Sequence, residues 1–148
     1  MVNILVPARN EEKNISDFIQ SLVAQDYPSF EILALDNQSS DATRSILQQI
    51  SNTHSKLKVL IGGSPPDGWL GKNWACSQMA KHAQRDLLFF TDADTFYKPG
   101  ALRAIVTAVI GEQADLLTDL PRQEVHSRGS SCLFPFSHGL SFALTHFD

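Results

Sequence analysis

Two aspartates, Asp92 and Asp94, flank one alanine, and only Thr91 separates them from the apolar run Leu87–Phe90. Alternate side chains of an extended segment lie on the same side, about 6.6 Å apart at the rise of a strand. Two carboxylates in this arrangement can share one hard cation, Mg²⁺ or Mn²⁺, together with phosphate oxygens and water. Such an ion neutralises the charge that builds on a departing diphosphate. Two acids can also end a strand as solvated turn residues, but their position after a strongly apolar run favours a metal site.

A second polar segment follows the first apolar run and consists of Pro7, Ala8, Arg9, Asn10, Glu11 and Glu12. Pro7 and the small Ala8 would let the backbone approach a planar ligand, and the N-terminus of the helix that follows favours anions. The acidic residues have a simpler explanation as well, because Glu11 and Glu12 complement a helix dipole. From the residues alone, both interpretations of Glu11 stay open.

Three further polar residues are candidates for ligand contacts. Asp36 ends an apolar run, where a carboxylate can accept hydrogen bonds from a base or a ribose. It is equally suited to forming a turn or capping a helix, and Asn37 can do either job. Lys72 can neutralise a phosphate as a point charge. The spacing around Lys72 is not that of a phosphate-binding P-loop, and the absence of GxGxxG argues against a dinucleotide-binding enzyme.

The apolar residues that must position these side chains alternate between two periodicities. Five short runs are predicted strands: Val2–Val6, Phe30–Leu35, Leu57–Ile61, Leu87–Thr91 and Ala114–Thr118. Between them, apolar residues recur at helical spacing, as in the stripe Ile15, Phe18, Ile19, Leu22 and Val23. This alternation predicts an α/β fold with an open, mostly parallel sheet and helices on both faces. Ligands bind beyond the carboxyl ends of such strands, so the polar segments are expected to meet at one edge.

The composition of the chain limits its function classes. Its 148 residues favour a single domain. A net charge of −4 without any cluster of Lys and Arg argues against a nucleic-acid partner. No basic region precedes an apolar run at the N-terminus, and no stretch reaches the roughly 20 apolar residues that span a bilayer. A cytoplasmic location is therefore expected.

Four motifs, in this order, resemble those of the family 2 glycosyltransferases of GT-A fold. They are Val-Pro-Ala-Arg-Asn-Glu-Glu (6–12), Leu-Asp-Asn-Gln-Ser-Ser-Asp-Ala-Thr (35–43), Gly-Lys-Asn-Trp-Ala (71–75) and Thr-Asp-Ala-Asp (91–94). Within that family, Pro-Pro-Asp-Gly-Trp-Leu-Gly-Lys-Asn-Trp-Ala (65–75) is similar to the branch associated with hopanoid and carotenoid glycosylation. Each motif is weak alone, and the specificity comes from their number and order.

The resemblance implies a Rossmann-like three-layer sandwich in which residues 1–120 bind a nucleotide diphosphate-sugar, with a UDP-sugar favoured. The implied donor-binding residues are Pro7, Ala8, Arg9, Asn10, Glu11, Asp36, Asn37, Lys72, Asp92 and Ala93. Lys72 would lie near the base or the diphosphate. Asp92 would face the ribose and the metal, and Asp94 would be the principal ligand of Mn²⁺ or Mg²⁺. The reaction implied is transfer of the sugar, with inversion, to an acceptor hydroxyl, for which a lipid or polyprenoid is expected.

The sequence departs from the family pattern in its second half. Inversion requires a general base, which the family takes from a downstream acidic motif such as Glu-Asp, and no Glu-Asp follows Asp94. The catalytic residue is therefore not identified, and the chain is expected to be a truncated, donor-binding portion. Residues 121–148 are predicted to begin an acceptor-side or membrane-proximal region. Their apolar part, Cys132–Phe147, is expected either to contact the inner face of the membrane or to be a core helix without its partner.

Three other functions fit parts of the pattern. A nucleotidyltransferase would use a related sheet, but its glycine-rich basic first loop is missing from Pro7–Glu11. A receiver-type signalling domain would use Asp36 as its phosphoacceptor, but it would need an acidic pair where Pro7-Ala8-Arg9 stands. A catalytically incomplete nucleotide-binding fragment is the third alternative. Most of the motifs favour a glycosyltransferase over these three functions.

Overall fold

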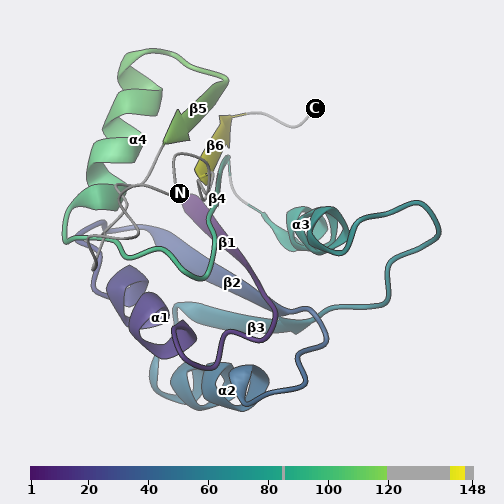
Figure 1. Cartoon of the computed structure of the whole chain (residues 1–148). Coiled ribbons are helices and arrows are strands. Elements are labelled where there is room, and N and C mark those ends of the chain that lie inside the picture. Colours follow the sequence, from purple (N-terminus) through teal and green to yellow (C-terminus); the bar gives the residue numbers. More distant parts are fainter. Residues whose placement is uncertain (85, 120–140, 146–148) are drawn as a thin grey trace, which may run out of the picture.

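The computed structural model describes residues 1–84, 86–119 and 141–145 (Figure 1). Helices and strands alternate from the N-terminus through the fifth strand, as the periodicities predict. In chain order the elements are β1 (Val2–Ala8), α1 (Ile15–Val23), β2 (Phe30–Asp36), α2 (Thr43–Thr53), β3 (Leu57–Ile61), α3 (Gly71–His82), β4 (Leu87–Phe90), α4 (Ala101–Gly111), β5 (Leu116–Asp119) and β6 (Ser141–Thr145).

The described strands form one sheet in the order β3-β2-β1-β4-β6-β5. The first four strands are parallel, with β1 in the middle between β2 and β4. Strand β6 runs antiparallel to both β4 and β5. The predicted open, mostly parallel sheet is confirmed, and β1, β2 and β4 bring their carboxyl ends to the same edge.

Helices cover both faces of this sheet, which gives three layers (Figure 1). On one face, alternate residues of β1 such as Ile4 and Val6 pack with the apolar sides of α1, α2 and α4. On the other face, Leu5 packs with Ala75 and Met79 of α3. Because β1 is buried on both faces, it is apolar almost throughout, as is usual for a central parallel strand.

The C-terminal strand corrects one expectation. Over Ser141–Thr145 the chain is a strand in the sheet, where Phe142 is the register partner of both Phe90 in β4 and Thr118 in β5. The helix alternative for Cys132–Phe147 is therefore wrong over these residues. A short apolar run without a helical period fits a strand inside a sheet. The rest of that segment lies outside the described residues.

None of the helices within the described residues is both long enough and apolar enough to cross a lipid bilayer.

Candidate functional site

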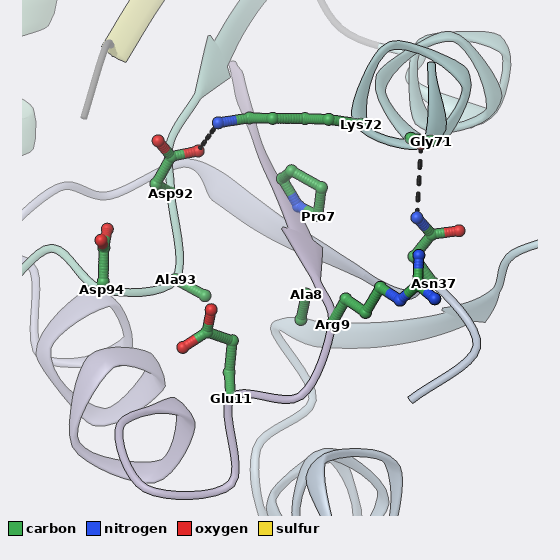
Figure 2. A pocket seen from close by; sticks show the side chains of 10 residues that line it. All are labelled: Pro7, Ala8, Arg9, Glu11, Asn37, Gly71, Lys72, Asp92, Ala93 and Asp94. Atoms are coloured by element: carbon green, nitrogen blue, oxygen red, sulfur yellow. Dashed lines mark hydrogen bonds and ion pairs between the residues drawn. The ribbon is translucent and has the colours of Figure 1, made fainter. Parts of the chain in front are cut away.

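A pocket of about 400 Å³ opens at the carboxyl edge of the parallel strands, between the ends of β1, β2 and β4 and the start of α3 (Figure 2). It is lined by Pro7, Ala8, Arg9, Glu11, Asn37, Gly71, Lys72, Asp92, Ala93 and Asp94. The topology therefore brings together residues that lie far apart in the sequence. All of the predicted site residues are in this lining except Asn10 and Asp36, and Gly71 lines it in addition.

Asp36 is buried and is not part of the pocket lining. Its side chain is only 2% exposed, and its Oδ1 accepts a hydrogen bond from the backbone N–H of Ser39 at 3.2 Å. This bond is the turn-forming role that the sequence left open, and a contact of Asp36 with a base or a ribose stays a prediction. A phosphoacceptor must be reached by its phosphodonor, so this burial also argues against a receiver domain.

Asn37, the neighbour of Asp36, is the residue at the end of β2 that reaches the pocket. Its Nδ2 donates a hydrogen bond to the carbonyl oxygen of Gly71 at 3.3 Å (Figure 2). This bond ties the first turn of α3 to the end of β2. Gly71 was not among the predicted site residues, and its only signal was its place next to Lys72 in a glycine-containing loop.

Asn10 holds the loop after β1 in place although it does not line the pocket. It has a positive φ of 57°, a conformation that asparagine tolerates better than most residues. Its backbone N–H donates to Ser39 Oγ at 3.0 Å, and its Oδ1 accepts from the backbone N–H of Ser40 at 2.9 Å. The next residue, Glu11, donates its backbone N–H to Thr43 Oγ1 at 2.8 Å. The loops after β1 and β2 therefore fix each other, and with them the position of Glu11.

Three carboxylates, those of Glu11, Asp92 and Asp94, line the same pocket. Figure 2 shows Glu11 extending toward Ala93, on the side of the pocket where both aspartates lie. Burial raises the pKa of Glu11 above its ordinary value, and the negative charges of Asp94, Asp41 and Asp92 raise it further, against a hydrogen bond with Asn14 that lowers it. Negative charge is thus in excess on this side of the pocket, and a bound cation would relieve it.

These carboxylates fit a divalent ion that is held jointly with a phosphate-bearing ligand. Among the described residues, no group of three or more His, Cys, Asp or Glu side chains is placed to hold a metal by itself. Mg²⁺ typically binds through one or two carboxylates, with waters and substrate phosphates supplying the other ligands. Asp92 and Asp94 would be the two carboxylates of such a site.

Lys72 makes an ion pair across the pocket. Its Nζ lies 2.5 Å from Oδ1 of Asp92, which links the start of α3 to the segment after β4 (Figure 2). The lysine side chain is 62% exposed, whereas that of Asp92 is 20% exposed. The lysine side chain therefore lies largely in solvent, whereas that of Asp92 is mostly buried. Sequence reasoning placed both residues in the site but did not predict their pairing.

The segment that carries Asp92 and Asp94 is supported from behind by buried polar residues. The hydroxyl groups of Thr91 and Tyr97 are 2.6 Å apart, and the backbone N–H of Tyr97 donates to Ser21 Oγ at 3.3 Å.

Gln25, which is 5% exposed, donates through Nε2 to the carbonyl oxygen of Lys98 at 3.1 Å. Its other contacts are Nε2 to the carbonyl oxygens of Ser21 and Tyr97 and Oε1 to the backbone N–H of Leu102.

These supporting residues were missed by sequence reasoning. Gln25 stands three residues after Leu22, where the apolar stripe of α1 would continue. A polar residue at such a position was the available signal, because burial there requires hydrogen-bond partners.

The family model described as "Glycosyl transferase family 2" matches residues 3–127. Among curated proteins, the chain is 30% identical over 113 residues to the 4,4'-diaponeurosporenoate glycosyltransferase of Staphylococcus haemolyticus, covering 76% of this chain and 29% of that relative. The chain thus spans less than a third of that relative's length.

Two solved structures have similar folds. S. aureus TarS 1-349 in complex with UDP-GlcNAc has a TM-score of 0.60 and 27% identity, covering 78% of this chain and 32% of that one. The mannosyltransferase PcManGT from Pyrobaculum calidifontis in complex with GDP-Man and Mn²⁺ has a TM-score of 0.74, covering 97% of this chain and 44% of that one. At 22% identity, the second comparison shows the fold alone. The family match over residues 3–127 covers most of the chain, and the chain therefore belongs to glycosyl transferase family 2.

Proposed function

We propose that this chain binds a nucleotide diphosphate-sugar in the pocket at the sheet edge, as the donor-binding portion of a metal-dependent, inverting glycosyltransferase. One observation carries the proposal: Glu11, Asp92, Asp94 and Lys72 line a single pocket at the carboxyl ends of parallel strands. This is where ligands of open α/β sheets bind, and the volume of about 400 Å³ falls in the range of small-molecule sites. Family membership supports glycosyl transfer over nucleotidyl transfer.

The residues of the lining divide into two groups with different tasks. Pro7, Ala8, Arg9 and Asn37 form the side of the pocket that we assign to the nucleoside. Lys72, Asp92 and Asp94 form the side that we assign to the diphosphate, with the two aspartates as ligands of Mn²⁺ or Mg²⁺. The cation, when bound, supplies charge neutralisation for the departing diphosphate. UDP is the favoured nucleotide because TarS, which is 27% identical to this chain, binds UDP-GlcNAc.

The proposal also includes the chemical class of the acceptor that receives the sugar. The similarity to a diaponeurosporenoate glycosyltransferase favours a lipid or polyprenoid hydroxyl as the acceptor. Such an acceptor would place the working enzyme at the inner surface of a membrane. No described residue is assigned as the general base, and the decisive test is therefore donor binding rather than turnover.

Thermal unfolding with a panel of ligands tests the proposal. UDP, GDP, CTP and acetyl phosphate are each added with and without Mn²⁺, and the unfolding temperature is followed by circular dichroism. We expect UDP with Mn²⁺ to give the largest rise, about 5 to 10 °C when the ligand is present at 100 times its dissociation constant. Stabilisation by CTP alone would favour a nucleotidyltransferase, and a response to none of the nucleotides would contradict the proposal.

A further inference from the structure

The ion pair between Lys72 and Asp92 engages one of the two carboxylates that we assign to the metal. Nζ of Lys72 lies 2.5 Å from one carboxylate oxygen of Asp92, inside the pocket lining. An oxygen that already accepts an ammonium group cannot ligate a divalent ion at full strength, because the two cations repel each other at that distance. Lysine and metal therefore compete for Asp92.

The structure allows the lysine to leave without disturbing the fold. Two hydrogen bonds anchor the backbone at the start of α3. Asn37 Nδ2 donates to the carbonyl oxygen of Gly71, and the backbone N–H of Trp74 donates to the carbonyl oxygen of Leu70. The side chain of Lys72 is 62% exposed and has a flexible stem. Its ammonium group can swing within the pocket while the helix stays in place.

We propose that Lys72 is an exchangeable counter-ion that couples diphosphate binding to metal binding. This inference rests on the proposed function. In the donor-free pocket the ammonium group neutralises Asp92 and lowers the affinity for a divalent ion. The diphosphate of an incoming donor offers the ammonium group a stronger partner, and its transfer to a phosphate oxygen releases Asp92 to the metal. The metal is thus bound tightly only together with the donor.

The charges of the pocket lining support this exchange. Three acidic side chains (Glu11, Asp92 and Asp94) face two basic ones (Arg9 and Lys72). Among the ion pairs of the described residues, Lys72 has a partner in this lining and Arg9 has none. In both states of the exchange Asp92 has a cationic partner, first the lysine and then the metal. A lysine suits the role because its compact charge and flexible stem let it change partners.

The test is a titration with Mn²⁺ alone, in which free Mn²⁺ is measured by electron paramagnetic resonance. The whole chain is used as wild type and as Lys72→Met, Lys72→Arg and Arg9→Met, each with and without UDP. Without UDP, we expect Lys72→Met to bind Mn²⁺ about 2- to 5-fold more tightly than wild type, as expected for the loss of one exposed ion pair. Adding UDP should raise the Mn²⁺ affinity of Lys72→Met less than it raises the Mn²⁺ affinity of the wild type. Lys72→Arg keeps the charge and should stay close to wild type.

Arg9→Met is the matched control, because it removes the same charge from the same pocket without removing the ion pair. In the absence of UDP, equal tightening of Mn²⁺ binding in Arg9→Met and Lys72→Met would show an effect of charge alone and would overturn the inference. Unchanged or weaker binding in Lys72→Met would overturn it as well, while UDP-dependent Mn²⁺ binding in the wild type would still support the proposed function. Absence of Mn²⁺ binding in every variant, even with UDP, would contradict the proposed function itself.

Discussion

Replacing Asp94 with alanine is expected to abolish the Mn²⁺-dependent part of the stabilisation by UDP while leaving the fold intact. The side chain of Asp94 is exposed and lines the pocket, so its removal takes away a ligand without opening a cavity in the core. A wild-type shift of about 5 to 10 °C with UDP and Mn²⁺ should fall to the value that UDP gives without metal. Thermal unfolding of the two proteins with UDP, in the presence and absence of Mn²⁺, measures the difference.

Asp86→Ala provides the control for this loss. Asp86 is an exposed acid directly before β4, whereas Asp94 follows that strand at its other end. The two substitutions change the net charge equally, but only one touches the pocket. An Asp94→Ala protein that keeps the full Mn²⁺-dependent shift, or an Asp86→Ala protein that loses it, would contradict the metal site.

The largest loss of stability is expected from Gln25→Met. Methionine has a similar size, but it removes the partners that Gln25 provides to the backbone N–H of Leu102 at 3.0 Å and to the carbonyl oxygen of Ser21 at 2.9 Å. Unsatisfied buried polar groups cost about 1 to 3 kcal/mol each, so we expect the free energy of unfolding to fall by about 2 to 4 kcal/mol. Urea unfolding, followed by circular dichroism, measures the change.

Gln20→Met is the matched control for Gln25→Met. Gln20 lies in the same helix but is exposed, and its substitution should change the free energy of unfolding by less than about 0.5 kcal/mol. Equal effects of the two substitutions would mean that the hydrogen bonds of Gln25 do not support the segment after β4.

The parallel half of the fold could be predicted from the sequence because its signals are local. The run Val2–Val6 is apolar at every position but Asn3, which fits a strand buried on both faces. The stripe on α1 appears as Ile15, Phe18, Ile19 and Leu22, all of which are buried. Strand β6 could not be predicted in the same way, because Ser141–Thr145 lies within a longer apolar segment, Cys132–Phe147, that has no clear period.

The functional site, like the fold, could be predicted from the sequence only in part. The convergence of Glu11, Lys72 and Asp92 follows from one rule about the carboxyl ends of parallel strands, so it could be predicted. The burial of Asp36 could not, because it depends on the turn that follows β2, in which the backbone N–H of Ser39 donates to its carboxylate. The ion pair of Lys72 depends on the position of α3 across the sheet, which no motif encodes.

The central claim is that a nucleoside diphosphate and a divalent ion bind together at the carboxylates of the pocket. Paramagnetic broadening in ¹H–¹⁵N spectra of the chain with UDP tests it most directly, with Mn²⁺ compared against diamagnetic Mg²⁺. We predict that the backbone amide signals of residues 8–11 and 91–95 lose intensity first and that those of Glu112 and Asp115 keep it. Broadening centred on Glu112 and Asp115, or spread evenly over the chain, would contradict the claim.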